Sequence, residues 1–378
     1  MNDLFIANIM SVIIFGLLYA TFLLTPKMSR KDLIFGVFIP LDRARDQELI
    51  RISKGYSKDL TVFTFLELLI YFILVNTLFK NPGILAAALF VSIGGYFLIF
   101  LRAYRKTKKY KMENNLLADK KQVVLINTSM SVKIRNSAVI STMWFIVPMI
   151  IALVNFILPL VKYEELPSRI ATHWNISGTA DSFIEKSFGA VVAHGLVPAA
   201  LVIIMVVSNF SIAVSKNRFD ASRPISSAKK LFKFKKINSI LIYSMTVIII
   251  SLITGLNLNS MNIVSLNMTG FTPFFIVLTL LMIFIPIGID VKMGQGGHRL
   301  KDNEEEMTDD TIINKDDDDF WKLGTIYYNP NDPSLFVEKR FGVGWTLNFG
   351  NKTAIIITVL FIIFIVLMCI FPLFFSKS

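Results

Sequence analysis

Long apolar runs separated by polar, basic stretches are the dominant pattern along this 378-residue chain. A helix needs about 20 apolar residues to cross the hydrocarbon core of a bilayer. The runs are continuous rather than alternating, so they predict helices and not barrel strands. The sequence therefore predicts an all-α integral membrane bundle with eight transmembrane helices, over Phe5–Leu24, Leu60–Phe79, Ile84–Leu101, Ala138–Val161, Phe188–Phe210, Ser239–Leu256, Phe271–Ile289 and Thr353–Phe375.

The positive charges predict the orientation of these spans. Residues 26–59, 102–137, 211–238 and 290–352 carry 8, 10, 8 and 8 Lys plus Arg, which is 34 of the 39 in the chain. Cytoplasmic loops carry the excess of Lys and Arg in membrane proteins. We therefore expect a multi-pass protein of the cell membrane, with these four segments in the cytoplasm and both termini outside.

The loops divide the chain into six regions. These are a three-helix region with basic loops (1–137), a helix pair flanking an outer loop at 162–187 (138–210), helices six and seven (211–291), an acidic linker (292–319), a small cytoplasmic domain (320–352) and the last helix (353–378). The acid-rich stretch Asp302–Asp319 is typical of a solvated, flexible linker. In the small domain, two short apolar runs on either side of the turn Asn329–Pro333 predict a β-hairpin.

Composition narrows the class of protein further. Hydrophobic residues make up 54% of the chain and charged residues 17%, whereas soluble domains carry about a quarter charged residues. A net charge of +12 is compatible with nucleic-acid binding. The charges lie between the apolar runs, however, which favours membrane orientation and predicts the lipid bilayer, not nucleic acid, as partner. The single cysteine, Cys369, excludes an intramolecular disulfide.

Two ionisable residues lie within the predicted spans, namely Glu67 and His194. Such residues normally face protein or water, because a charge at mid-bilayer costs about 2.5–3.5 kcal/mol on insertion scales. Each of the two has two interpretations: a proton- or ligand-binding site, or a hydrogen bond that holds neighbouring helices together.

The long outer loop is the best candidate for external binding, through His173, Trp174, Asn175, Asp181 and Lys186. A metal site built from His173, Asp181 and the neighbouring glutamates is the alternative, but no paired-ligand spacing favours it. No dinucleotide, P-loop or nucleophile-elbow motif occurs. We therefore predict no enzymatic activity, no cofactor and no metal. On the cytoplasmic side, Trp321, Tyr327, Tyr328 and Trp345 either contact a protein partner or form the core of the small domain.

The outer loop carries a distinctive series: Leu166-Pro167, Ile170, His173-Trp174-Asn175, Gly178, Asp181 and Lys186-Ser187. It resembles a bacterial membrane-domain family of unknown function that also opens the SdpI-type immunity proteins. A second series, Trp321, Gly324, Tyr327 to Pro333 and Gly344 to Asn348, is similar to a small C-terminal domain of unknown function that accompanies the first. A third element, Phe35 to Pro40, is like the Gly-hydrophobic-Pro element of such proteins, and Phe341-Gly342-Val343 echoes it.

Together these features predict a non-enzymatic bacterial membrane protein. It would sense, or give immunity to, an antimicrobial peptide or another envelope signal, with an extracellular peptide ligand and a cytosolic protein partner. The alternative is a proton-coupled small-molecule transporter or permeability factor that uses Glu67 and His194, favoured by the prolines within the spans.

Overall fold

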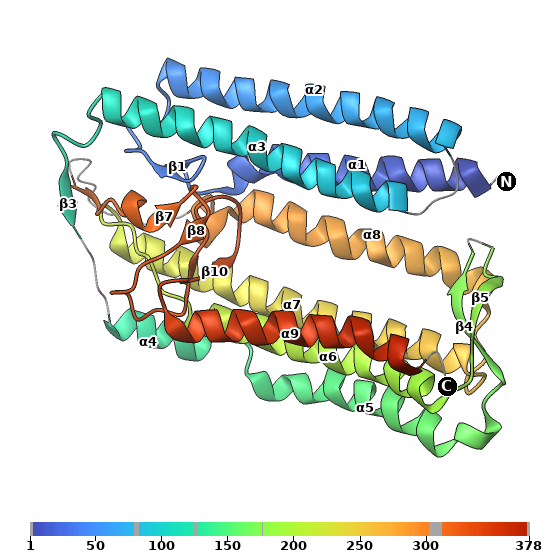
Figure 1. Cartoon of the computed structure of the whole chain (residues 1–378). Helices are drawn as coiled ribbons and strands as arrows, with labels where there is room; N and C mark the ends of the chain where they lie inside the picture. Colours follow the sequence, from blue (N-terminus) through green and yellow to red (C-terminus); the bar gives the residue numbers. More distant parts are fainter. Residues whose placement is uncertain (1–2, 79–82, 124–127, 176, 302–311, 376–378) are drawn as a thin grey trace.

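The computed structural model describes residues 3–78, 83–123, 128–175, 177–301 and 312–375 (Figure 1). In this part of the chain the helices are α1 (Asp3–Met28), α2 (Gln47–Leu78), α3 (Gly83–Glu113), α4 (Thr128–Ser137), α5 (Ile146–Val161), α6 (Phe188–Val214), α7 (Pro224–Ser260), α8 (Met268–Met293) and α9 (Lys352–Phe375). Local signals set several boundaries. The Ser187 hydroxyl caps α6 by accepting from the Ala190 N–H, and Pro224 opens α7.

Seven of these helices are long and apolar enough to cross a membrane: Asn8–Met28, Gln47–Thr77, Ile84–Glu113, Thr142–Val161, Phe188–Val214, Pro224–Ser260 and Met268–Gly297. Each overlaps one of the first seven predicted spans, although α2, α3 and α7 extend well beyond the predicted ends on the basic side and the fourth span begins at Thr142 instead of Ala138. The eighth prediction, Thr353–Phe375, falls on α9, whose apolar stretch Lys352–Leu367 is shorter than the other seven. The described helices thus support a multi-pass membrane protein with mostly helical structure.

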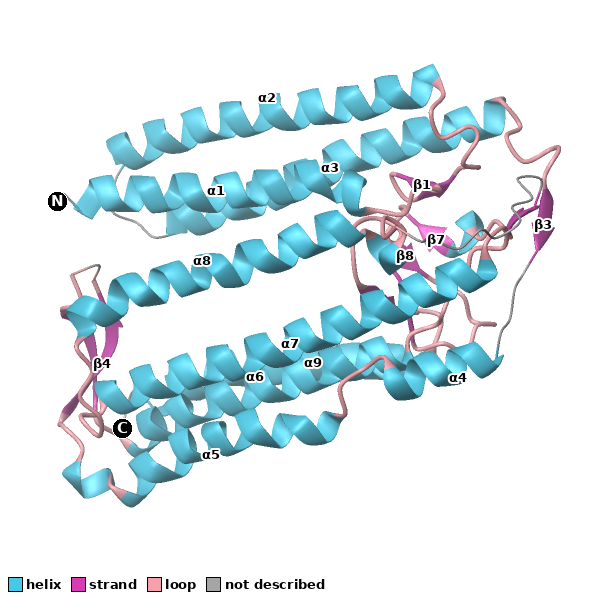
Figure 2. Cartoon of the chain, turned by 180° about the vertical axis from the view of Figure 1, so that it is seen from behind, coloured by secondary structure: helices cyan, strands magenta, loops and turns pink. Residues whose placement is uncertain are grey.

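The long helices form two groups with α8 between them (Figures 1 and 2). On one side α1 packs against α2 and α3; on the other, α5, α6, α7 and α9 pack together. Helix α8 contacts α1 on one side and α7 on the other. Within α8, which is described throughout, Met293 at the last position is the one buried residue. The two groups are therefore bridged by a helix that is packed loosely along its length.

The pair Gly94-Gly95 lies within the third predicted span, yet α3 continues through both glycines. The reason lies in α2. A Cβ on Gly95 would lie 2.1 Å from Cζ of Phe63, so the bare backbone at Gly95 admits the phenyl ring of the neighbouring helix. At this position glycine allows α2 and α3 to pack closely and does not interrupt the helix.

Short two-stranded sheets lie at the two ends of the bundle. The pair β4 (Arg169–Trp174) and β5 (Ala180–Glu185) lies at the end that holds both termini (Figure 1). We call this pair the HWN hairpin and its end the hairpin end. The opposite end holds the segments rich in Lys and Arg, and we call it the basic end. It carries the pairs β1 (Leu33–Ile34) with β2 (Val37–Phe38), β3 (Lys121–Val123) with β6 (Ile312–Asn314), β7 (Trp321–Lys322) with β8 (Ile326–Tyr327), and β9 (Phe336–Glu338) with β10 (Trp345–Leu347).

The hairpin predicted around Asn329–Pro333 is wrong. Strand β8 precedes this turn and pairs with β7, whereas β9 follows it and pairs with β10. The turn itself folds into a hydrogen-bonded cage, described below, so its polar residues do not serve as a hairpin connection. We refer to residues 320–352 as the C-terminal unit.

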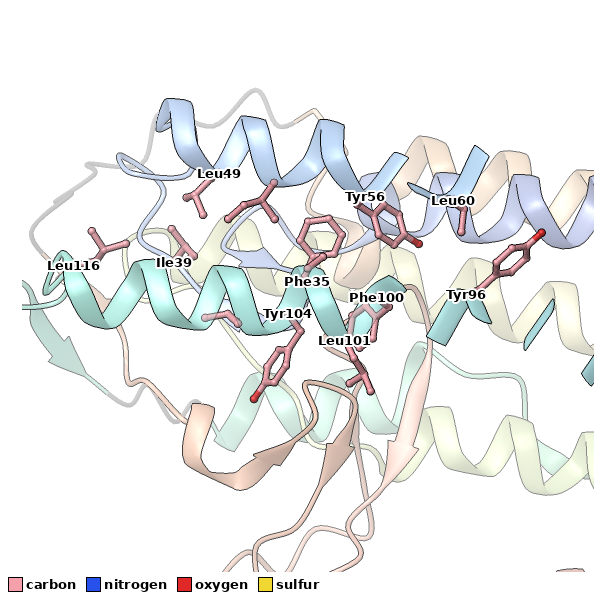
Figure 3. Packing of buried hydrophobic residues seen from close by; sticks show 13 residues of the cluster. Phe35, Ile39, Leu49, Tyr56, Leu60, Tyr96, Phe100, Leu101, Tyr104 and Leu116 are labelled. Carbon is pink, nitrogen blue, oxygen red and sulfur yellow. The ribbon is translucent and has the colours of Figure 1, made fainter. Parts of the chain in front are cut away.

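The largest buried cluster lies at the basic end of the α1–α3 group (Figure 3). Phe35 and Ile39 from the β1–β2 segment pack between Leu49 and Tyr56 of α2 and Phe100 of α3. The turn between β1 and β2 places Phe35 and Gly36 at φ values of 47° and 81°, a conformation that favours glycine at the second position. The sequence echo at Phe341 has a structural counterpart, since its ring lies 4.3 Å from that of Phe100 and 6.2 Å from that of Phe35.

Candidate functional site

The HWN hairpin is built on an apolar base at the ends of the helices. Ile170 of β4 is fully buried with Leu166, Val191 of α6 and Met261, which follows α7. Lys186 donates to the carbonyl oxygens of Tyr163 and Leu166, at 3.3 Å each. These contacts fix both feet of the hairpin to the bundle.

His173 and Asp181 form an exposed pair on the two strands of the hairpin. Nδ1 of His173 lies 2.5 Å from Oδ1 of Asp181, and the side chains are 66% and 43% exposed. Neighbouring Trp174 is half-buried and pairs with Ala180 across the ladder. Of the residues predicted for external binding, His173 and Asp181 are the two that combine solvent exposure with a defined geometry.

Two other residues of the predicted binding set hold the hairpin together. The Asn175 side-chain oxygen accepts from the backbone N–H groups of Ser177 and Thr179, at 3.0 Å each, which closes the turn. Lys186 is occupied by the carbonyls described above and lies over the Tyr163 ring at 5.1 Å. Their side chains are therefore engaged within the protein, and a ligand contact through them remains a prediction.

The tip of the HWN hairpin rests on the first turn of α8. A Cβ on Gly178 would lie 2.6 Å from the Met268 carbonyl carbon and 2.9 Å from the Thr269 nitrogen. Gly178 also has a φ of +77°, so both space and backbone conformation favour glycine there. The hairpin thus makes direct backbone contact with the helix that bridges the two helix groups.

The two intramembrane polar residues lie in different helix groups. The Ser92 hydroxyl of α3 donates to Oε1 of buried Glu67 on α2 at 2.8 Å. On α6, Nδ1 of His194 donates to the Ala190 carbonyl at 2.8 Å, and the His194 carbonyl accepts from Asn155 of α5 and Asn257 of α7. The Glu67 side chain thus joins two neighbouring helices, as one of the two interpretations holds, whereas the His194 imidazole bonds within its own helix and only its backbone carbonyl joins α6 to α5 and α7. The structure does not bring the two residues together.

The C-terminal unit places most of its aromatic residues inside. Trp321 and Tyr327 form a small core with Val337, and Trp345 packs 5.6 Å from the ring of Phe234 on α7. Phe320 and Tyr328 are the exceptions, at 37% and 47% exposure. Of the four residues considered for partner contact, Trp321 and Tyr327 thus form the unit's own core, and Tyr328 is the one whose ring is exposed.

The residues of the Tyr-Tyr-Asn-Pro-Asn-Asp-Pro turn form a hydrogen-bonded cage. Buried Asn348 donates from its side-chain amide to the carbonyls of Asn329 and Asp332, at 2.9 Å each. Its side-chain oxygen accepts from the Asn329 N–H at 3.0 Å. The Tyr327 hydroxyl donates to Asp332 at 2.9 Å, and Lys216 binds the same carboxylate oxygen at 2.7 Å. The amide side chains at this turn therefore satisfy buried backbone groups, as burial requires.

An ion-pair network at the basic end was not predicted from the sequence. Arg340, 1% exposed, pairs with Asp317 and Asp318 and donates to the Gly36 carbonyl at 2.9 Å. Asp317 also pairs with Arg218 at 3.0 Å, and Asp318 with Lys111 of α3 at 2.5 Å. The opposing charges hold the pKa of both carboxyl groups below the usual range despite their burial. We call these five residues the Arg340 network.

The prediction that the acidic stretch is solvated is wrong for Asp316 to Asp318. Residues 302–311 lie outside the described part of the chain, but Asp316 to Asp318 are half-buried between α3, the loop after α6 and the C-terminal unit. A run of four aspartates is typical of solvated segments. Only the fold supplies the three cations, which come from positions 111, 218 and 340.

The far end of α8 contacts the C-terminal unit. After Gly294 ends the helix at φ +67°, the fully buried Gln295 accepts through its side-chain oxygen from the Gly344 N–H at 2.7 Å. Glu338 lies beside Gly296, with its carboxylate oxygens 3.6–3.8 Å from where a Cβ would be. Helix α8 thus touches the HWN hairpin at one end and the C-terminal unit at the other. Among the described residues, no three His, Cys, Asp or Glu side chains come together as a metal site.

Comparison with known proteins identifies two segments of the chain. Residues 150–197 match a domain of unknown function, DUF1648, and residues 330–355 match a family of unknown function, DUF5808. The first match covers the HWN hairpin with parts of α5 and α6, and the second covers Asn348, Asp332 and the start of α9. Both are consistent with an uncharacterised multi-pass membrane family. No curated protein and no solved structure matches the chain.

Proposed function

We propose that this chain is a non-enzymatic bacterial protein of the cell membrane that senses, or gives immunity to, an antimicrobial peptide or another envelope signal. In this proposal it crosses the bilayer eight times, with α9 as the eighth span. Both termini and the HWN hairpin lie outside, and residues 26–59, 102–137, 211–238 and 290–352 lie in the cytoplasm. The distribution of Lys and Arg supports this orientation, because the basic end then faces inward.

The observation that carries the proposal is the pair of contacts made by α8. Gly178 of the hairpin touches its first turn, and Gly344 of the C-terminal unit hydrogen-bonds to Gln295 just after its last turn. One helix therefore contacts the most distinctive element on each side of the bilayer. A displacement of α8 that begins at one contact alters the geometry of the other contact, because the helix is a rigid element that joins the two.

The packing of α8 is suited to such a shift. Met293 is its one buried residue. Few packing contacts must therefore be broken when the helix moves. The resemblance of the hairpin motif to the loop of SdpI-type immunity proteins supports the same role.

The exposed pair of His173 and Asp181 is the proposed contact for the ligand. An imidazole beside a carboxylate offers a donor and an acceptor to a peptide, and both side chains point into solvent. The resemblance to immunity proteins favours a peptide over other envelope signals. On the cytoplasmic side, the C-terminal unit would pass the change to a protein partner.

The first experiment compares the peptide sensitivity of four bacterial strains: one lacking the chain, and three producing the wild type, His173→Ala or Glu164→Ala. Glu164 is exposed in the same outer segment and serves as the matched control. We expect deletion to raise sensitivity to a membrane-active peptide, and wild type and Glu164→Ala to restore resistance where His173→Ala does not. Equal sensitivity in all strains would overturn the proposal, and flux assays on Glu67→Gln and His194→Gln would then test the transporter alternative.

A second variant tests the role of α8. Gln295→Ala removes the hydrogen bond to Gly344 without touching the hairpin. We expect this variant to bind peptide like the wild type and to lose the cellular response. A full response in Gln295→Ala would show that the signal does not pass through this contact.

A further inference from the structure

An apolar face of the β7–β8 hairpin is left uncovered at the basic end. In the ladder Trp321 pairs with Tyr327, and both point into the core of the C-terminal unit. The flanking positions Phe320, Ile326 and Tyr328 are 37%, 41% and 47% exposed, and Leu323 at the turn is 41% exposed. Four large apolar side chains are thus exposed on one short hairpin, and exposed apolar side chains gathered in this way mark an interaction surface.

The depth of this patch relative to the bilayer follows from the contact between the hairpin turn and α3. A Cβ on Gly324, at the hairpin turn, would lie 2.7 Å from Cδ2 of Tyr104. About 20 helical residues cross the roughly 30 Å hydrocarbon core, so a helix that enters it at Ile84 leaves it near Tyr104. The hairpin turn therefore lies at the boundary between hydrocarbon and headgroups.

A second contact gives the same depth from a different helix. The Gly342 N–H of the C-terminal unit donates to the Ser29 hydroxyl at 2.8 Å, and a Cβ on Gly342 would lie 3.2 Å from Thr25 in the last turn of α1. Helix α9, which crosses in the opposite direction, begins within the same unit at Lys352. Three helices thus place the C-terminal unit against the membrane surface.

We propose that the exposed face of the β7–β8 hairpin docks on the inner-leaflet headgroup region of the bilayer. Leu323 and Ile326 would reach the acyl boundary, while Phe320 and Tyr328 take the interfacial position that aromatic rings prefer. Exposed Lys322 lies directly opposite Ile326 in the ladder and donates one N–H to the Asp319 carbonyl at 2.8 Å. The other N–H groups and the positive charge of its ammonium group then select anionic headgroups. This inference rests on the membrane placement and is independent of the sensing role.

The test measures where the face lies relative to lipid and water. In the full chain carrying Cys369→Ser, a fluorophore is attached to Ile326→Cys and the protein is placed in nanodiscs of phosphatidylcholine with phosphatidylglycerol. Leu98→Cys, 66% exposed on the lipid-facing part of α3, is the lipid control. Glu113→Cys, 60% exposed at the end of α3 about 13 Å beyond Tyr104, is the aqueous control.

We expect the Ile326 label to be quenched by spin-labelled lipid, like the Leu98 label, and to resist an aqueous nickel chelate. Adding Lys322→Gln is expected to lower the ratio of docked to undocked hairpin about fivefold in the anionic nanodiscs. The control Lys109→Gln, at an exposed lysine on α3, is expected to leave this ratio unchanged. An Ile326 label that behaves like the Glu113 label would overturn the proposal and assign the face to a cytosolic protein. An unchanged ratio in Lys322→Gln would overturn the selection for anionic lipid.

Discussion

Replacing Arg340 by methionine tests whether the Arg340 network holds the C-terminal unit to the helix bundle. The substitution removes the guanidinium that pairs with Asp317 and Asp318 and donates to the Gly36 carbonyl, and keeps much of the side-chain volume. Removing one partner of a buried ion pair costs about 3–5 kcal/mol. Asp317 keeps Arg218 and Asp318 keeps Lys111, so we expect the lower value, about 3 kcal/mol.

The loss of stability in Arg340→Met can be measured within the C-terminal unit itself. A loss of about 3 kcal/mol corresponds to a roughly 150-fold change in an opening equilibrium, so amide hydrogen exchange across β7 to β10 should accelerate by about that factor in Arg340→Met. The matched control is Arg51→Met, because Arg51 is 81% exposed and pairs with Glu48 on the surface of α2. Exposed pairs of this kind contribute about 0–1 kcal/mol, so the control should exchange like the wild type.

The pH dependence provides an independent check. The pKa values of Asp317 and Asp318 are lowered in the folded chain. Their contribution to stability is therefore complete above the unfolded pKa of about 3.9 and is lost as pH falls through the folded values. The difference between wild type and Arg340→Met should be largest near neutral pH and narrow as the carboxylates become protonated. Exchange that is unchanged in Arg340→Met, or equally faster in Arg51→Met, would refute the reasoning.

Three further predictions follow from other parts of the structure. Gly178→Ala places a Cβ 2.6 Å from the Met268 backbone at a φ of +77°, so it should detach the HWN hairpin from α8 and make the hairpin more sensitive to proteolysis. The control Gly288→Ala, at a position with open space around it, should leave the rate of proteolysis unchanged. Asn348→Ala removes four side-chain hydrogen bonds from a buried cage and should destabilise the C-terminal unit by about 2–3 kcal/mol in denaturant titrations; wild-type stability would contradict the cage. Burial lowers the pKa of His298 to about 4. As pH falls, the unfolded chain therefore gains a proton on this residue near pH 6.5, before the folded chain does. The free energy of unfolding should consequently decrease from pH 6.5 towards pH 4. His298→Gln should flatten this slope in thermal unfolding curves, and an identical slope in both proteins would contradict the assignment.

The candidate site was predicted from the sequence only in part. The hairpin motif pointed to His173 and Asp181, which the fold brings together because β4 and β5 pair in antiparallel register. The same motif did not reveal that Gly178 rests on α8, since that contact joins positions 90 residues apart. Aromatic residues of the C-terminal unit were ambiguous, because a buried core and a contact surface use the same residue types.

The sequence by itself determined the helical class and the approximate spans, because apolar length and backbone hydrogen bonding act locally along the chain. It also determined which segments share the basic end, since the Lys and Arg residues cluster between alternate spans. The tertiary structure alone decided that Asp317 and Asp318 meet Arg218, Lys111 and Arg340, and that α8 joins the hairpin to the C-terminal unit. These contacts connect residues that are distant in sequence, and a charge or a glycine carries no local signal of the partner that the fold will bring to it.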